Sequence, residues 1–421
     1  MVVPCTGGRL FRMHSEQRHI DTKHEPQQAR HHRSHLLIKL RTATRVLALL
    51  GTTLLYYPSL NAQTSPKHAI VAYVFPQNTV LQPGDIAANK LTRVNYAFAN
   101  IKDGKIIDGF PTTAANLATL TALRQQNPSL TVLASVGGWT WSGNFSDVAL
   151  TPQSRAIFID SVVAFVERYN LDGLDIDWEY PGMIGNGNRF RPEDKQNYTL
   201  LLKELRERFN REEKNLHRRL FITIATGSSK EFLDHTEMAE VQKYVDTVNL
   251  MAYDFYEPGS EPTTGHHAPL LTNPNDPKHI SADNSVQQYE QAGVPAAKIV
   301  LGVPFYGHVW GQVPATNHGL FQPGKPIPNT FARYNDISNM LNSGFTRYWD
   351  ATADAPYLYN PEKQIFVSYE DPESLAFKSK YLLDHHLGGI MFWDYSSDPS
   401  GALLDAIDKG LGQPRAQKTT K

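Results

Sequence analysis

The repeated alternation of short β-rich apolar runs with helical patterns constrains the fold of this chain more than any other feature. Predicted strands cover residues 69–75, 93–101, 131–136, 173–179, 221–225, 247–252, 299–304 and 388–393. Helical periodicity is clearest over residues 154–169, 192–217, 285–292 and 372–386. Alternating strands and helices form parallel sheets, and about eight such units close into a barrel. We therefore expect an α/β fold, a TIM (β/α)8 barrel, with functional residues at the C-terminal ends of its strands.

One interval is too long for this pattern. Between the seventh predicted strand and the helix that begins near residue 372 lie about 60 residues, more than a structureless loop in a compact domain normally has. We predict a small α+β insertion over residues 307–368, between strand 7 and helix 7 of a barrel domain that covers residues 66–412. Residues 413–421 are expected to form a mobile tail. Large aromatic residues of the insertion are expected mainly to pack inside it: Trp310, Tyr334, Trp349 and Tyr357.

A row of carboxylates lies within one predicted strand, in the stretch LDGLDIDWEYP at residues 171–181. From Leu174 onward, apolar and acidic residues alternate strictly, so Asp175, Asp177 and Glu179 share one face of the strand. Neighbouring carboxylates on that face are then roughly 6.6 Å apart. An ordinary apolar core does not tolerate such a row, because burying like charges side by side is unfavourable.

This row must share protons, pair with other groups or face a solvated cleft. Shared protons raise the pKa of a carboxyl group, as a general acid working near neutral pH requires, and Glu179 at the strand end is the candidate acid. Two other interpretations are an edge strand whose acidic residues face solvent idly and a calcium site. Calcium sites more naturally take their oxygen ligands from a turn than from a rigid alternation.

The motif DGLDIDWE, residues 172–179, resembles the DxxDxDxE signature of the family 18 glycoside hydrolases, the chitinases and their relatives. Further blocks occur in the order that this family has: SVGG at 135–138, MAYDF at 251–255, LGVPFYG at 301–307 and GGIMFWDYSSD at 388–398. Spaced blocks in the right order are far more specific than any one of them. The resemblance spans roughly residues 69–410 and implies a chitinase that hydrolyses β-1,4-linked N-acetylglucosamine polymers or oligomers.

The resemblance implies a role for each acidic residue of the row. In this family the 2-acetamido carbonyl of the substrate attacks its own anomeric carbon, and a cyclic oxazolinium ion forms with retention of configuration. Glu179 is expected to act first as the acid and then as the base. Asp177 is expected to hold the acetamido NH, and Asp175 to share a proton with Asp177.

Other blocks are expected to surround the reacting sugar. By resemblance, Tyr253 donates its hydroxyl to the acetamido oxygen, and Asp254 beside it positions the sugar. Trp393 forms the floor beneath the sugar, because the CH groups on pyranose faces stack on aromatic rings. Met251 is expected to pack under the site.

Further candidates for substrate contact are Tyr73, Tyr306, Trp139 and Trp141. For the two tyrosines the alternative is packing in the core, and for the two tryptophans it is packing within a loop. One position departs from the family pattern, since His308 follows PFYG where the family often has arginine. A substrate contact at that position is expected to be weaker or replaced.

The resemblance also implies non-proline cis peptide bonds at the mouth of the barrel. We expect them between Glu179 and Tyr180 and between Trp393 and Asp394, with a third between Ala97 and Phe98. Trans geometry at the first two bonds would contradict this expectation.

The first 65 residues have the character of a targeting segment. A polar segment rich in arginine and histidine ends at Arg45, and an apolar run follows over residues 46–57. We predict a secretory signal cleaved near Ala62, and hence an extracellular or periplasmic protein. An uncleaved anchor is the alternative, although the run is shorter than the about 20 residues of a membrane span. Cys5, the single cysteine, lies in this leader, so a mature chain would have no disulfide.

Charge and histidine spacing restrict the partners. Residues 1–45 hold nine of the 41 Lys/Arg and three of the 42 Asp/Glu, which leaves 32 basic and 39 acidic residues downstream. A mildly acidic chain lacks the basic face of a nucleic-acid-binding protein. We expect chitin or a chitooligosaccharide as the partner, no integral membrane span in the mature chain, and a monomer. No cofactor or metal is expected, because neighbours such as His266-His267 and His385-His386 do not share a face of a strand or helix.

Two related functions are alternatives. One is an endo-β-N-acetylglucosaminidase that acts on other N-acetylglucosamine glycans. The second is a catalytically silent, lectin-like chitin-binding protein, as some members of the family are. Such members typically lose the acid, whereas Glu179 is present here together with both aspartates.

Overall fold

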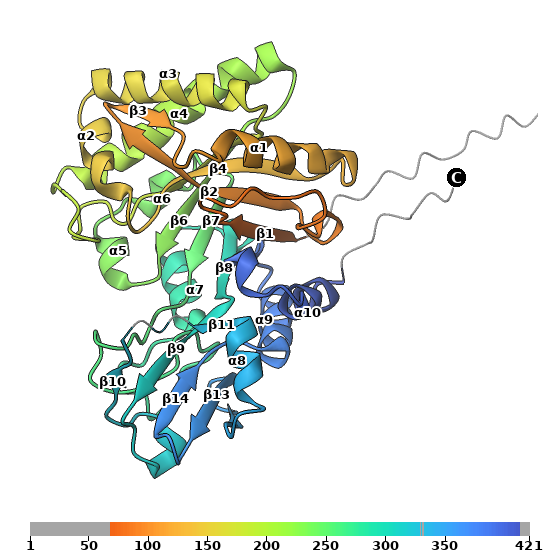
Figure 1. The fold of residues 1–421 in the computed structure, drawn as a ribbon. Helices are drawn as coiled ribbons and strands as arrows, with labels where there is room; N and C mark the ends of the chain where they lie inside the picture. Colours follow the sequence, from red (N-terminus) through yellow and green to blue (C-terminus); the bar gives the residue numbers. More distant parts are fainter. Residues whose placement is uncertain (1–67, 329, 331, 413–421) are drawn as a thin grey trace, which may run out of the picture. The chain divides into compact units, whose positions relative to one another are not determined.

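The computed structural model describes residues 68–412 apart from residues 329 and 331; the predicted leader with its cleavage position and the predicted tail lie outside the described residues. Within the described part, eight parallel strands close into a barrel, in which the first strand pairs with both the second and the last (Figure 1). The strands, in barrel order, are β1 (Ala69–Val74), β2 (Arg93–Lys102), β4 (Thr131–Gly137), β5 (Gly173–Asp177), β6 (Phe221–Gly227), β7 (Thr247–Met251), β8 (Ile299–Pro304) and β15 (Gly389–Trp393). The predicted barrel is confirmed, with strand ends shifted by at most two residues.

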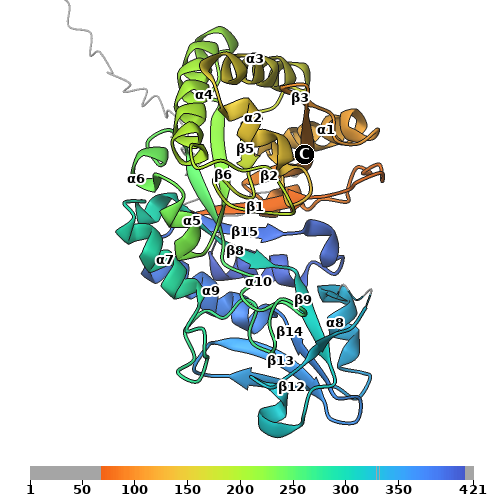
Figure 2. The same ribbon diagram turned by 90° about the vertical axis from the view of Figure 1, so that its left-hand side faces the viewer.

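Helices cover the outside of the barrel, and α3 and α4 lie side by side there (Figures 1 and 2). The predicted helices are confirmed as α3 (Pro152–Arg168), α4 (Asp194–Leu216), α7 (Ala282–Gln291) and α9 (Pro372–Asp384). Helices that were not predicted are α1 (Thr113–Ala122), α2 (Phe145–Ala149), α5 (Lys230–Asp234), α6 (Met238–Val241) and α10 (Ala402–Gly410). The buried face of α1 includes Thr113 and Asn116, so an apolar stripe at helical spacing is incomplete there.

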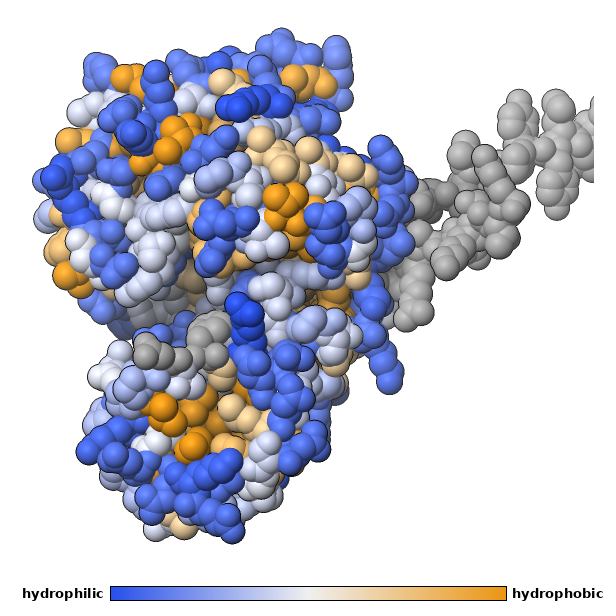
Figure 3. All heavy atoms as spheres, in the orientation of Figure 1, coloured by the Kyte–Doolittle hydropathy of each residue, from blue (hydrophilic) through white to orange (hydrophobic). Residues whose placement is uncertain are grey.

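The predicted insertion is also confirmed, as a mostly antiparallel sheet between β8 and α9 (Figure 2). Its elements are β9 (Tyr306–Gly311), β10 (Lys325–Pro326), β11 (Ala332–Arg333), α8 (Tyr334–Met340), β12 (Thr346–Asp350), β13 (Ala355–Asn360) and β14 (Ile365–Ser368). Trp310 and Tyr357 are buried within it, as expected, whereas Trp349 packs on Phe377 of α9. In the space-filling view the surface is indented where the insertion meets the barrel (Figure 3).

A capping residue joins the insertion to the barrel. Asp371 precedes α9 and accepts hydrogen bonds from the backbone N–H groups of Glu373 and Ser374, both at 3.0 Å, as an N-cap residue does. Arg347 of β12 donates to Asp371 at 2.7 Å and to Glu373 at 2.7 Å. The insertion is therefore held against the start of a barrel helix by charge-assisted hydrogen bonds.

The three expected cis peptide bonds are present, at Ala97–Phe98, Glu179–Tyr180 and Trp393–Asp394. Within the described residues, no helix combines the length and the apolar character that a membrane span requires.

Candidate active site

Three carboxylates, here called the acidic ladder, occupy the inside of the barrel at β5: Asp175, Asp177 and Glu179. Their exposed fractions are 0%, 4% and 9%, and Glu179 lies two residues beyond the end of the strand. The apolar residues of the alternation face outward, where the Trp178 ring stacks 5.2 Å from Phe145. Because β5 lies between β4 and β6, the interpretation as a solvent-facing edge strand is wrong.

The first carboxylate, Asp175, is held by side chains from β1, β4, β6 and β7. It accepts hydrogen bonds from Tyr73 Oη at 2.9 Å, Ser135 Oγ at 2.7 Å, Asn249 Nδ2 at 3.1 Å and Thr223 Oγ1. Burial raises the pKa of Asp175, and the hydrogen bonds from Thr223, Ser135 and Tyr73 oppose that rise. The donors therefore fix this carboxylate in place and favour its ionised form.

Arg93, the first residue of β2, crosses the floor of the barrel beneath this network. Its Nη1 donates to Thr247 Oγ1 at 3.0 Å, and β7 lies opposite β2 in the closed strand order. Thr247 Oγ1 donates in turn to Asn249 Oδ1 at 3.3 Å, and the amide of Asn249 reaches Asp175. The charge of buried Arg93 also favours ionised Asp175. Sequence reasoning missed Arg93, because an arginine at the start of a strand is usually solvent-exposed.

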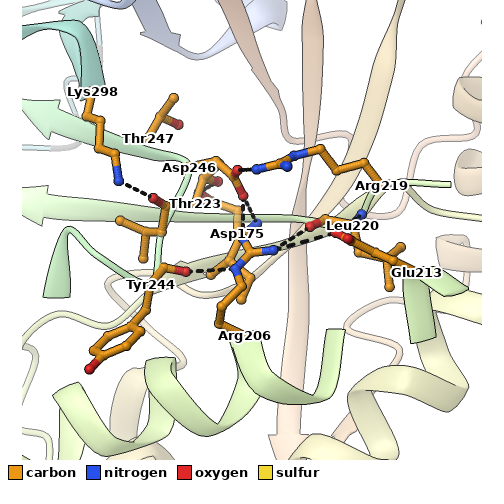
Figure 4. Close-up of polar contacts among 12 residues, drawn as sticks. Asp175, Arg206, Glu213, Arg219, Leu220, Thr223, Tyr244, Asp246, Thr247 and Lys298 are labelled. Atoms are coloured by element: carbon orange, nitrogen blue, oxygen red, sulfur yellow. Dashed lines mark hydrogen bonds and ion pairs between the residues drawn. The ribbon is translucent and has the colours of Figure 1, made fainter. Parts of the chain in front are cut away.

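Ionic contacts surround the same floor outside β6 and β7 (Figure 4). Asp246, directly before β7, accepts hydrogen bonds from Arg206 Nη2 at 2.5 Å and from Arg219. Lys298 donates to the backbone oxygen of Val245 at 3.0 Å. These contacts lie at the N-terminal ends of the strands, which in such barrels contribute to stability rather than to the reaction.

The second carboxylate, Asp177, is buried without comparable support. Its Oδ1 atom has no hydrogen-bond partner among the described residues. Burial raises the pKa of Asp177 well above its ordinary value, and the negative charges of Glu179 and Asp175 add to the rise. The carboxyl group is therefore suited to hold a proton and to bind a polar group of a ligand.

The third carboxylate, Glu179, has the pKa of a general acid. Burial raises the pKa of Glu179 to about 7; a hydrogen bond from Tyr180 opposes the rise, and the charge of Asp254 adds to it. Two hydrogen bonds fix the backbone of Glu179. Its N–H donates to Ser142 Oγ at 2.9 Å, and its carbonyl oxygen accepts from Asn188 Nδ2 at 3.0 Å. A carboxyl group with a pKa near 7 can give and take a proton at neutral pH.

Four residues named as site candidates from the sequence lie beside the ladder: Tyr73, Met251, Tyr253 and Trp393. These four residues belong to one packed cluster inside the barrel. The ring centroids of Tyr73 and Trp393 are 6.0 Å apart. Phe98, which was not predicted, stacks on Trp393 at 5.4 Å.

A row of aromatic rings leads away from Trp393. Phe75 lies 5.4 Å from Trp393 and 5.9 Å from Phe110, and Phe110 lies 5.0 Å from Trp141. Trp141 therefore joins the row, whereas Trp139 is 51% exposed and has no ring contact with the described part of this row. Phe75, the last residue of the first predicted strand, and Phe110, in a loop, were missed because phenylalanine at such positions carries no specific signal.

Asp254 lies among hydroxyl and imidazole groups on the side of the insertion. Tyr306 Oη donates to both of its carboxylate oxygens at 2.7 Å, and His308 Nε2 lies 2.8 Å from Oδ1. Burial alone would raise the pKa of Asp254, but the neighbouring imidazoles of His267 and His308 outweigh burial and hold the pKa below its ordinary value. The residue that departs from the family pattern, His308, thus contacts an expected substrate-binding carboxylate. His267 was not predicted as part of the site.

Proteins of one known family resemble this chain in sequence and in fold. The model of the glycosyl hydrolases family 18 matches residues 68–398. Chitinase A1 of Niallia circulans is 37% identical over 389 residues, which cover 78% of this chain but only 56% of that protein. Chitinase 1 of Aphanocladium album is 32% identical, with 79% of this chain and 82% of the relative covered. The solved structure of a family 18 N-acetylglucosaminidase from Paenibacillus barengoltzii has a TM-score of 0.74 at 40% identity and covers 82% of this chain and 99% of that one.

Proposed function

Because this chain belongs to the glycosyl hydrolases of family 18, we propose that it is a chitinase that hydrolyses β-1,4-linked N-acetylglucosamine polymers or oligomers with retention of configuration. The observation that carries this proposal is the acidic ladder, with Glu179 at a pKa of about 7 beside buried Asp177. A buried carboxyl group that is partly protonated at neutral pH is what leaving-group protonation needs.

In the proposed first step, protonated Glu179 gives its proton to the oxygen of the scissile bond. The bond from that oxygen to the anomeric carbon breaks as the 2-acetamido oxygen of the same sugar attacks the carbon. Asp177 accepts a hydrogen bond from the acetamido N–H and balances the positive charge of the oxazolinium ion. The Tyr253 hydroxyl donates a hydrogen bond to the acetamido oxygen. The unpartnered Oδ1 of Asp177, within the described residues, supports this role.

In the proposed second step, ionised Glu179 takes a proton from water as the water attacks the anomeric carbon from the vacated side. The acetamido group is released, and the product keeps the configuration of the substrate. Asp175 shares the proton of Asp177, so the two carboxyl groups together carry less negative charge. Hydroxyl and amide donors hold Asp175 in place. Trp393 supports the apolar face of the sugar.

The variant Glu179→Gln tests the assignment of the acid. It keeps the size of the side chain but cannot give up a proton, so kcat on a fluorogenic chitooligosaccharide should fall at least about a hundredfold. Glu207→Gln, an exposed change on α4, is the matched control and should leave kcat unchanged. Equal activity of Glu179→Gln and the wild type would remove Glu179 from the mechanism. Cleavage of a substrate with hydroxyl in place of the acetamido group would exclude substrate assistance.

The nearest alternatives differ in product and in activity. A relative of known structure is named an N-acetylglucosaminidase, so this chain could release single sugars rather than dimers or longer products. Chromatography of the products of a chitooligosaccharide distinguishes these cases, and action on other N-acetylglucosamine glycans would favour the endo-β-N-acetylglucosaminidase alternative. The complete acidic ladder argues against a silent lectin-like protein.

We also propose that the protein is secreted, as the leader over residues 1–65 predicts. Mass spectrometry of the chain recovered outside the cell checks this proposal. A chain that retains its leader and stays in the cell would contradict it.

A further inference from the structure

Side chains from distant parts of the chain converge next to the proposed sugar site. Asp254 follows β7, His267 lies farther along the same connection, and His308 belongs to β9; these residues are called the Asp254 cluster below. One potential ligand atom from each lies within 4.8 Å of the others. His308 Nε2 is 2.8 Å and His267 Nδ1 is 3.6 Å from Asp254 Oδ1, and the two imidazole centroids are 4.8 Å apart.

His267 is the unusual member of the cluster. It is 0% exposed, and neither of its ring nitrogens meets hydrogen-bond criteria with any described residue. A buried polar nitrogen without a partner is unfavourable, so such a group calls for an explanation. Its backbone is held rigidly, because its N–H donates to Ser368 Oγ at 2.8 Å and its oxygen accepts from the N–H of Phe255 at 3.1 Å.

We propose that Asp254, His267 and His308 form a binding site for a divalent transition-metal ion of the Zn²⁺ type. Two imidazoles and one carboxylate are a ligand set that Zn²⁺ and related ions prefer, whereas Mg²⁺ and Ca²⁺ prefer sites made of oxygen atoms. Around a tetrahedral ion with bonds of about 2.1 Å, ligand atoms lie about 3.4 Å apart. The separations of 2.8 Å and 3.6 Å bracket that value, so small side-chain movements suffice for these two pairs.

The ring nitrogen of His308 and the access from solvent also suit a metal ion. His308 can ligate through Nε2 once its proton resides on Nδ1. A surface cavity of about 620 Å³ reaches His308 and Glu257, and Glu257 Oε1 lies 4.0 Å from His308 Nε2. An ion could therefore enter from solvent and complete its coordination with water or with Glu257.

Binding of the ion has a consequence for the proposed hydrolase, and this consequence rests on the proposed function. The ion would occupy the Asp254 carboxylate, which is proposed to position the sugar and which Tyr306 also contacts. Zn²⁺ should therefore raise KM more than it lowers kcat.

The test compares metal binding by the wild type and His308→Arg, both as the full chain without an affinity tag. Arginine removes the imidazole ligand but can still pair with Asp254. After treatment with a chelator, each protein is titrated with Co²⁺ by visible absorption and with Zn²⁺ by calorimetry. The wild type should bind one more ion per chain than His308→Arg, or bind it at least about tenfold more tightly. Histidines of the leader are present in both proteins, so their binding cancels in the comparison.

Two further variants keep the test decisive. His267→Gln removes the buried ligand and should lose metal binding to the same extent, so it replaces His308→Arg if that variant does not fold. His385→Gln, an exposed change after α9, is the control and should bind the metal as the wild type does. Unchanged binding in a folded His308→Arg or His267→Gln would overturn the proposal and leave only a hydrogen-bonded trio. Because binding is measured without substrate, a protein that binds the ion but cleaves no chitooligosaccharide contradicts the proposed function alone.

Discussion

At the scale of single residues, the three carboxyl groups of the acidic ladder differ in what surrounds each charge. Asp175 accepts hydrogen bonds from hydroxyl and amide groups, while Asp177 lies between the charges of its two neighbours. For Glu179 the main influence is burial, which raises its pKa to about 7. Environment therefore separates three chemically similar groups into a carboxyl group held by hydrogen-bond donors, a proton-sharing group and a proton donor.

The raised pKa of Glu179 predicts a limit on activity at high pH. The acid must carry its proton for the first step, so kcat/KM should fall about tenfold per unit as pH rises above about 7. Initial rates on a short chitooligosaccharide from about pH 5 to pH 9 measure this limb, whose apparent pKa belongs to Glu179 coupled with Asp177. A limb near 4.5, the ordinary pKa of a glutamate, would contradict the assignment.

The same pKa shift predicts how stability changes with pH. Folded Glu179 binds its proton more tightly than the unfolded chain does, so its contribution is complete below about pH 4.5 and is lost as pH rises toward about 7. Glutamine cannot ionise, so the free energy of unfolding of Glu179→Gln should fall less over this interval, by on the order of 3 kcal/mol. Urea unfolding at both ends of the interval measures the difference. Identical pH dependence in the two proteins would show that Glu179 is not buried as described.

At the scale of elements, strand register assembles the network around Asp175. In the parallel pairing of β5 with its neighbours, Asp175 is opposite Ser135 on β4 and opposite Thr223 on β6. A shift of one residue would turn these hydroxyl groups to the other face of the sheet. Arg93 adds a contact across the barrel, since it joins β2 to β7 through Thr247.

Replacement of Arg93 tests this cross-barrel contact. Arg93→Met should lower the free energy of unfolding by about 2 kcal/mol, because partly buried Thr247 loses a charged donor. It should also lower kcat more than it changes KM, because the pKa of Asp175 rises when the positive charge is removed. Arg93→Lys keeps the charge and should recover part of kcat, which a purely structural role does not predict. Arg211→Met, exposed on α4, is the control for both measurements.

At the scale of the whole described molecule, a buried ion pair connects the barrel, the insertion and the connection that carries His267. Lys378 of α9 is fully buried and pairs with Glu370, which follows the last strand of the insertion. Lys378 Nζ also donates to the backbone oxygen of Ala268 at 2.8 Å. Burial raises the pKa of Glu370, and Lys378 opposes that rise. This pair therefore orders the side of the proposed site that contains the Asp254 cluster.

Removal of one partner of this pair should be strongly destabilising. Lys378→Met leaves Glu370 buried without its cation, so the free energy of unfolding should fall by about 4 kcal/mol. The double variant Lys378→Met with Glu370→Gln should recover part of that loss, because no unpaired charge remains. Urea unfolding of the single and double variants measures the coupling. Lys380→Met, exposed on the same helix, is the control, and a loss as small as in the control would exclude a structural role for the pair.

The sequence alone determined the features that depend on neighbours along the chain. Alternation over residues 174–179 places three carboxylates on one face, and this periodicity holds wherever the strand is located. Eight predicted strands alternating with helical patterns predicted the barrel for the same reason, and the interval of about 60 residues predicted the insertion. Family motifs then named Tyr253 and Trp393, which the structure brings to the ladder.

Only the tertiary structure decided which side chains from separate strands meet. Arg93 reaches Thr247 because closure of the barrel sets β2 opposite β7. No pattern of neighbouring residues in the sequence predicts that contact. His267 and His308 meet at Asp254 because the insertion packs beside the connection after β7, although the sequence had paired His267 with His266. Periodicity depends on the backbone of one segment, whereas a cluster of side chains depends on the packing of segments far apart in the chain, and packing is a property of the folded molecule as a whole.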